Sequence, residues 1–215
     1  MAARLEGPGR VRELFASLRP RVELAGWYLV ALLTFPAIHV LGEAAYRQTS
    51  GIPAGAWLYP PSVPEQWSAL VLMPLVEEPG WRGFATPRLA ERYGWLRASW
   101  FVGVAWAAWH AVMFVLQGFD TRSFVLGMIM IAAGSVVFGW LFDRTRGSLL
   151  AAVVAHAGVH LDNPTRALPD QLRAYTAFTA AVCAAAAVIV VLEALRRGRL
   201  LTAHSGADGQ GRTRD

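Results

Sequence analysis

Hydrophobic residues gather in six long segments along the chain, and shorter polar stretches separate them. An α-helix needs about 20 predominantly apolar residues to cross a bilayer. The apolar segments cover residues 25–46, 66–87, 97–117, 123–142, 147–162 and 172–195. The pattern predicts an all-α fold, namely a polytopic transmembrane bundle of about six helices in which the fifth helix is the shortest.

The composition favours the same class of protein. Hydrophobic residues make up 55% of the 215 residues, only 16% are charged, and the mean hydropathy is +0.37, unlike a soluble globular domain. The net charge of +5 comes from arginines at segment ends rather than along one stripe. We therefore interpret them as topology signals and lipid headgroup contacts, and expect no nucleic acid partner. Their distribution predicts an integral membrane protein, in the cell membrane if the source is bacterial, with both termini cytoplasmic.

The same pattern divides the chain into three parts. We expect a cytoplasmic N-terminal segment (1–24), an integral membrane domain (25–196) and a disordered cytoplasmic tail (197–215). Residues 1–24 lack the uninterrupted apolar core and small-residue site of a cleavable signal peptide. The proline-rich residues 47–65 predict an external loop. Cys183 is the single cysteine, which excludes an intrachain disulfide and a cysteine-ligated metal site.

Three charged residues interrupt the second apolar segment, in the stretch LVEEPGWRG from Leu75 to Gly83. Each would cost about 2.5 to 3.5 kcal/mol near the middle of a bilayer if it were unpaired. Glu78 and Arg82 are four residues apart and can pair on one helix face. Glu77 points about 100° away from Glu78 and has no such partner within its own helix. Pro79 predicts a kinked or widened helix at this point.

Histidines supply the other candidate chemistry. His110 lies in the third predicted helix, and His156 and His160 share one face of the fifth. His39 lies near the outer end of the first helix, where its simplest role is structural, and His204 lies in the polar tail. Counted from the predicted cytoplasmic ends of their helices, His110 and His156 fall at about the depth of Glu77. We therefore expect an active site buried between three helices.

These side chains are suited to hydrolysis. A carboxylate beside a neutral imidazole can take a proton from water, and two adjacent glutamates should titrate as a coupled pair. Glu77, His110 and His156 are also candidate ligands for a Zn²⁺ ion that would activate the water. The soluble zinc-protease motif H-E-x-x-H is absent, because Ala157 follows His156.

The order E-E-x-x-x-R, then aromatic-x-x-x-H, then H-x-x-x-N resembles the CAAX protease and bacteriocin-processing enzyme family, also called the CPBP or Abi family, of intramembrane proteases. The resemblance covers residues 65–163, and the first motif matches at every fixed position. Trp106 stands where the family usually has phenylalanine, and His160 stands where asparagine or aspartate is usual. Asp162 and Asn163 lie just beyond and could take that place only if the helix end shifted.

The resemblance implies hydrolysis of a peptide bond inside the membrane, in a peptide or a membrane-anchored protein. Glu77 and His110 would activate a water, and His156 with His160 would stabilise the oxyanion. Glu78 and Arg82 would orient and neutralise the site. Members are often described as metalloproteases, and a metal-free glutamate mechanism fits these residues at least as well.

Three other functions use some of the same residues. A non-catalytic membrane scaffold of the same fold would accommodate the departure at His160. A proton-coupled transporter also needs intramembrane acids and histidines, although the six segments do not form two similar halves. A haem-binding electron carrier with His110 and His156 as axial ligands leaves Glu77, Glu78 and Arg82 unexplained.

Overall fold

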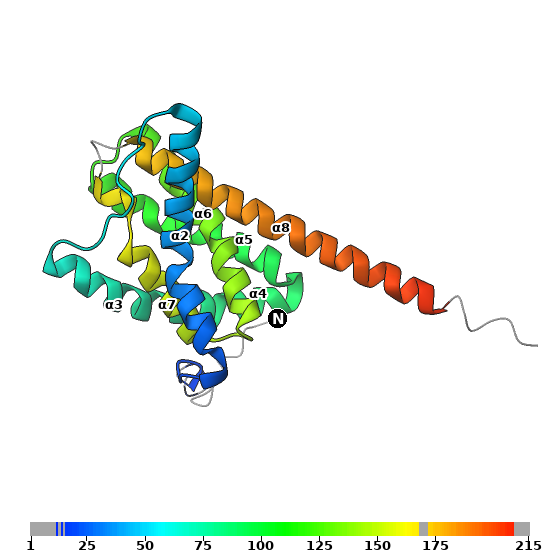
Figure 1. Ribbon diagram of the computed structural model, residues 1–215. Helices are drawn as coiled ribbons and strands as arrows, with labels where there is room; N and C mark the ends of the chain where they lie inside the picture. The colour runs from blue at the N-terminus through cyan, green and yellow to red at the C-terminus, as the bar shows by residue number, and fades with distance from the viewer. Residues whose placement is uncertain (1–11, 13, 15, 168–171, 209–215) are drawn as a thin grey trace, which may run out of the picture.

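The computed structural model describes residues 12, 14, 16–167 and 172–208, and within these ranges it contains helices and no β-strand. The all-α prediction is therefore confirmed. The long helices are α2 (Ala25–Ser50), α5 (Trp95–Leu116), α6 (Thr121–Arg144) and α8 (Leu172–Asp208) (Figure 1). The shorter elements are η1 (Val22–Leu24), α3 (Pro64–Glu78), η2 (Pro79–Ala85), α4 (Thr86–Tyr93), α7 (Leu149–Leu161) and η3 (Pro164–Ala167).

Four of the described helices are long and apolar enough to cross a membrane. They cover Val22–Ser50, Trp95–Leu116, Thr121–Arg144 and Leu172–Arg196, and they coincide with the first, third, fourth and sixth predicted segments. The fifth segment corresponds to the shorter apolar helix α7. The chain is thus an integral membrane helix bundle.

The second predicted segment, 66–87, is helical throughout and changes its type of helix at Pro79. The α-helix α3 ends at Glu78, and a π-helix, η2, follows from Pro79 to Ala85. Proline lacks a backbone N–H, which interrupts the regular hydrogen bonds of an α-helix. The widening that Pro79 predicts is confirmed, and such π-helical turns often lie at functional sites.

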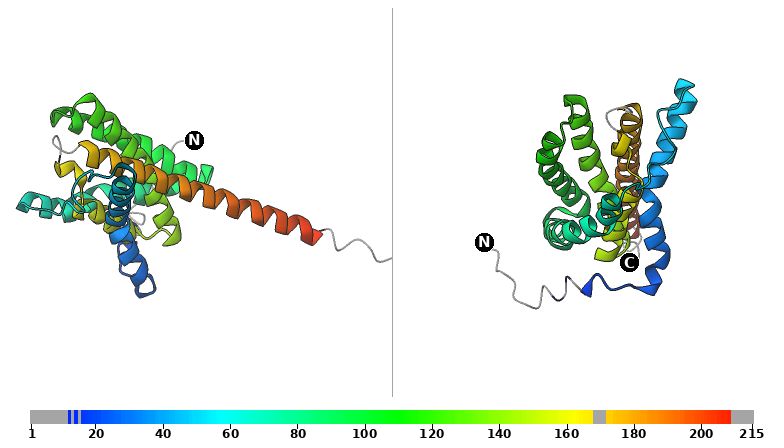
Figure 2. Two further views of the ribbon diagram at one scale, coloured as in Figure 1. Left: turned by 45° about the horizontal axis from the view of Figure 1, so that its top comes forward. Right: turned by 90° about the vertical axis from the view of Figure 1, so that its left-hand side faces the viewer.

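The last helix is longer than the sixth predicted apolar segment, 172–195. α8 continues past residue 196 to Asp208, where a disordered tail is predicted from 197. Alanine, leucine and arginine are strong helix formers, and eight of the ten residues 194–203 are of these three types. The C-terminal part of α8 extends away from the other helices (Figures 1 and 2). Residues 209–215 lie outside the described part of the chain, as does most of the predicted segment 1–24.

Small residues let the helices around the core approach closely. α6 packs against α5 and α8, and α7 packs against α2 and α3. A Cβ atom on Gly103 of α5 would lie 2.7 Å from the carbonyl oxygen of Ala132 on α6, so only glycine permits this separation. Val136 and Leu141 of α6 are completely buried. The same packing brings α3, η2, α5, α6 and α7 around one cluster of ionisable side chains.

Candidate active site

Glu78 and Arg82 form the ion pair that their spacing predicts. Nη1 of Arg82 donates to Oε1 of Glu78 at 3.0 Å, and the two residues are 0% and 1% exposed. Removing two charges from water is costly unless hydrogen bonds satisfy them. The pair therefore has to be completed by groups from other helices.

The partners of Arg82 come from α5 and α6. Nη2 of Arg82 donates to the hydroxyl of Ser135 at 3.3 Å, and that hydroxyl donates to the carbonyl of Ser99 at 2.9 Å. The guanidinium also lies over the rings of Trp106 and Phe138, at 4.4 and 4.2 Å from their centres. Aromatic faces attract a cation most strongly where water is excluded. Arg82 is therefore held in one position between three helices.

His156 is the third member of this group. Its Nδ1 lies 2.8 Å from Oε1 of Glu78. A carboxylate accepts hydrogen bonds, so Nδ1 carries the proton and donates it, which leaves Nε2 for a second partner. Oε2 of Glu78 has no hydrogen-bond partner in the described part of the molecule. Glu78 thus joins α3, η2 and α7 at one carboxylate oxygen.

Glu77 occupies a different environment. It is only partly buried, and its Oε2 accepts a hydrogen bond from the indole Nε1–H of Trp106 at 2.8 Å. This partner comes from α5, in agreement with the prediction that Glu77 has none in its own helix. Phenylalanine at position 106 would lack the donor. Tryptophan in place of the usual phenylalanine at position 106 therefore adds a hydrogen bond to Glu77.

His110 lies one helical turn after Trp106 and contacts its ring, with the ring centres 5.5 Å apart. Its Nδ1 donates to the carbonyl of Trp106 at 2.9 Å, which leaves Nε2 of the imidazole for another group. Trp106 thus touches Glu77 through its N–H and His110 through its ring. Glu77 and His110, the two residues predicted to activate water, thus both contact the side chain of Trp106.

His160 stacks on His156, with ring centres 5.1 Å apart and an interplanar angle of 15°. Asp162, considered above as a replacement for the missing asparagine, points elsewhere. Its two carboxylate oxygens bind Nδ1 of His39 and the backbone N–H of Tyr59. His160 therefore remains the candidate at that position.

The candidate metal ligands do not form a preassembled set. Among the described residues, no group of three histidine, cysteine, aspartate or glutamate side chains is arranged to hold a metal ion. The Nδ1 atoms of His110 and His156 are bonded to the Trp106 carbonyl and to Glu78, which leaves the Nε2 atom of each ring for a further ligand.

Sequence reasoning did not identify several residues of the site. Ser135 and Phe138 hold Arg82, and both lie in α6, which has no charged residue in its central part. A serine in the middle of an otherwise apolar segment was the available signal. His39, assigned a structural role, is buried and bonded to Asp162. That contact spans 123 positions in the sequence, so no local pattern predicts it.

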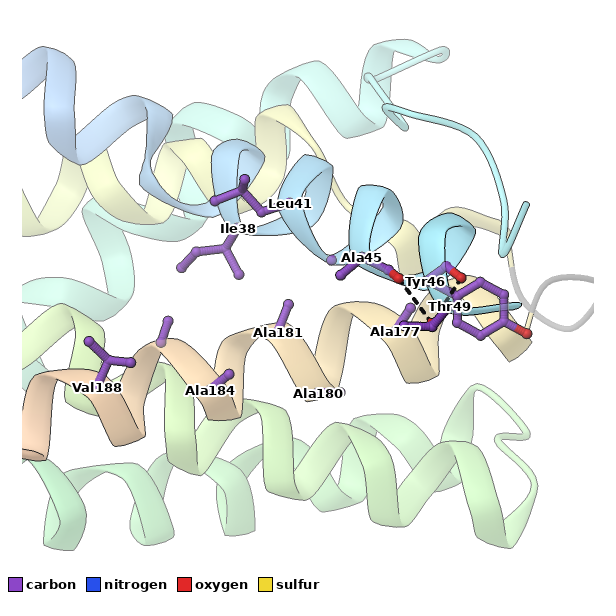
Figure 3. A pocket seen from close by; sticks show the side chains of 12 residues that line it. Ile38, Leu41, Ala45, Tyr46, Thr49, Ala177, Ala180, Ala181, Ala184 and Val188 are labelled. Atoms are coloured by element: carbon purple, nitrogen blue, oxygen red, sulfur yellow. Dashed lines mark hydrogen bonds between the residues drawn. The ribbon is translucent and has the colours of Figure 1, made fainter. Parts of the chain in front are cut away.

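A separate apolar groove of about 530 Å³ lies between α2 and α8 (Figure 3). Ile38 and Tyr46 contribute to one wall, and Ala181 and Val188 contribute to the other. Its lining contains none of the ionisable residues of the site. Because both helices are candidate spans, we expect lipid chains to cover this groove.

The fold and the site define an integral membrane helix bundle with a cluster of two glutamates, an arginine and three histidines between its helices. Residues 24–161 match the family of type II CAAX prenyl endopeptidase Rce1-like proteins, and the chain belongs to this family. The family predicted from the three sequence motifs is thus confirmed. A curated relative, CAAX prenyl protease 2 of Methanococcus maripaludis, is 27% identical over 112 residues. The match covers 48% of this chain and 41% of that relative, so the chain spans less than half of the relative's length.

Proposed function

We propose that the chain is an intramembrane endopeptidase that hydrolyses a peptide bond with a water activated by Glu77 and His110. The observation that carries the proposal is the difference between the two adjacent glutamates. Glu78 is buried and bonded to both Arg82 and His156. Glu77 is partly exposed and is held by Trp106 through one oxygen, Oε2. Glu78 is therefore suited to hold other groups, and Glu77 is suited to accept a proton.

The water would bind between Oε1 of Glu77 and Nε2 of His110. As its oxygen attacks the carbonyl carbon of the substrate, one of its protons passes to Glu77. The C–O bond forms and the carbonyl π electrons become the oxyanion. When the C–N bond breaks, the proton on Glu77 passes to the departing nitrogen. The products are a carboxylic acid and an amine, and the glutamate regains its original state.

The oxyanion would bind to the two stacked histidines of α7. Nδ1 of His156 is held by Glu78, and the His156 ring lies 5.4 Å from the Trp106 ring between centres, which leaves Nε2 of His156 for the substrate. Protonated His156 can donate Nε2–H to the oxyanion, and the N–H of His160 can add a second donor. Preorganised donors of this kind typically lower the barrier by about 3 to 4 kcal/mol each.

We propose a peptide of a membrane-anchored protein as the substrate. The name of the archaeal relative, CAAX prenyl protease 2, supports a prenylated C-terminal peptide as the first compound to test. The bilayer would bring the anchored chain to the bundle by lateral diffusion. Both chain ends would lie in the cytoplasm, as the arginine distribution predicts.

The experiment is cleavage of quenched-fluorescent peptides, with and without a prenylated cysteine, by the purified full chain in detergent. Glu77→Gln and His110→Ala should each lower kcat by about 100-fold or more, as expected for loss of general acid–base catalysis. Glu65→Gln is the matched control, because Glu65 is exposed at the start of the same helix, α3. It should retain the wild-type rate.

A zinc chelator added to each reaction tests the metal. Unchanged cleavage supports the metal-free mechanism proposed here, and loss of cleavage that zinc restores would assign a metal role to the same residues. If the folded wild-type chain cleaves no peptide, or if Glu77→Gln cleaves as fast as wild type, the proposal is wrong. The scaffold alternative would then be favoured.

A further inference from the structure

A group of four residues outside the catalytic motifs binds the C-terminal end of α7. We propose that this group, His39, Tyr59, Asp162 and Arg166, is a clamp that positions His160 and His156 for the reaction. The positioning role rests on the proposed function, whereas the clamp itself can be tested without it. The four residues come from α2, the segment between α2 and α3, the end of α7, and η3.

Asp162 is the centre of the clamp. It is 2% exposed and follows the last residue of α7 with an extended backbone. Its Oδ2 accepts a hydrogen bond from Nδ1 of His39 at 2.7 Å, and its Oδ1 accepts one from the backbone N–H of Tyr59 at 2.6 Å. Hydrogen bonds to an ionised carboxylate are about twice as strong as neutral ones. One side chain thus fastens the end of α7 to two other parts of the fold.

The carbonyl of Tyr59 is bound from the same side. It accepts hydrogen bonds from the backbone N–H of Asn163, at 3.2 Å, and from the guanidinium of Arg166. Arg166 also donates to the carbonyl of His160. The peptide groups on both sides of Tyr59 are therefore bonded to residues that follow α7, and the last turn of α7 is bonded directly to Arg166.

His39 is buried in the clamp although one of its ring nitrogens has no hydrogen-bond partner among the described residues. It is 1% exposed, its ring stacks on Tyr59 and meets Phe178 edge-on, and its Nε2 has no hydrogen-bond partner in the described part of the chain. An apolar side chain would fill the same space without a buried unpaired nitrogen. The hydrogen bond from Nδ1 to Asp162 is what such a side chain would lack.

The clamp binds the C-terminal turn of α7, which carries His160. The last carbonyl groups of a helix lack partners within the helix, and helix ends fray unless other groups bind them. His160 lies two residues before Asp162 and stacks on His156. Fraying of this turn would move His160 first and would remove its ring from His156. The clamp therefore fixes the two histidines assigned to the oxyanion.

The test is hydrogen–deuterium exchange of the purified full chain in detergent, read on peptides covering residues 54–63 and 157–164. His39→Leu removes the donor to Asp162, whereas His39→Asn keeps an N–H close to the position of Nδ1. We expect exchange at least about tenfold faster in both peptides for His39→Leu, and near wild-type exchange for His39→Asn. Thr49→Val, at an exposed position of the same helix, is the matched control.

Arg166→Gln is a second variant, for use if His39→Leu does not fold, because Arg166 is only partly buried. It should also make exchange faster in both peptides. In the peptide assay, kcat should fall about tenfold or more with His39→Leu and should recover with His39→Asn, with KM changed less. Exchange equal to wild type in both His39→Leu and Arg166→Gln overturns the clamp. Faster exchange with unchanged kcat overturns the positioning role. If wild type cleaves nothing, the proposed function fails, and the exchange data still decide whether the clamp holds α7.

Discussion

Trp106→Phe removes one hydrogen-bond donor from the candidate site and keeps an aromatic ring there. In the wild type, Nε1 of Trp106 lies 2.8 Å from Oε2 of Glu77, while the ring contacts Arg82, His110 and His156. Phenylalanine can keep the ring contacts and cannot make the hydrogen bond. The variant therefore isolates the contribution of the indole N–H to holding the proposed base.

The magnitude follows from the kind of bond. A hydrogen bond to a charged group contributes about 1.5 to 3 kcal/mol. If Glu77 needs this bond to keep its position in the transition state, kcat should fall by a factor of about 10 to 150. Trp106 is 5% exposed, so the smaller ring also leaves unfilled space and lowers the free energy of unfolding, by about 1 to 3 kcal/mol. The two effects must be measured separately.

The assay compares kcat and KM on a cleavable quenched-fluorescent peptide with the thermal unfolding midpoint of the same preparations. Trp109→Phe is the matched control, because Trp109 lies in the same helix and is 67% exposed. It should leave kcat unchanged. The reasoning is refuted if Trp106→Phe, measured where it is fully folded, keeps the wild-type kcat and KM.

Three further predictions concern stability. Arg82→Met should lower the free energy of unfolding by about 3 to 5 kcal/mol, because it leaves the carboxylate of Glu78 buried without its cation; denaturant unfolding of the full chain measures this, and a loss below 1 kcal/mol would contradict it. Gly103→Val should destabilise the bundle by about 1 to 3 kcal/mol or more, because its side chain would collide with the α6 backbone 2.7 Å away; an unchanged thermal midpoint would refute the close packing. Asp120 is the N-cap of α6. Its pKa is lowered mainly by the hydrogen bond from the hydroxyl of Ser123, and next by the hydrogen bond from the backbone N–H of Ser123. The ionised cap therefore stabilises α6 above the ordinary aspartate pKa, and this contribution is lost as the pH falls through the lowered value. The difference in thermal midpoint between wild type and Asp120→Asn should be constant at neutral pH and should shrink in acid, and a difference that does not depend on pH would contradict the assignment.

The sequence by itself determined the class of fold and most of the site. Long apolar segments can satisfy their backbone groups in a bilayer only as helices, and all six predicted segments correspond to helices, the second of them with a π-helical stretch. The pairing of Glu78 with Arg82 followed from helical spacing, and so did the shared face of His156 and His160. These features depend on residues three or four apart, so a local rule is sufficient to predict them.

Only the tertiary structure decided how these elements combine. The spacing of Glu77 and Glu78 predicts two directions, but not that one acid meets Trp106 and the other meets His156. The partners of Arg82 in α6, and the bond between His39 and Asp162, join residues 53 and 123 positions apart. Apolar periodicity indicates that helices pack together, but it does not predict which helix faces contact each other. That choice rests on the shapes and small residues of the helix surfaces, which assemble the site only when the whole bundle has formed.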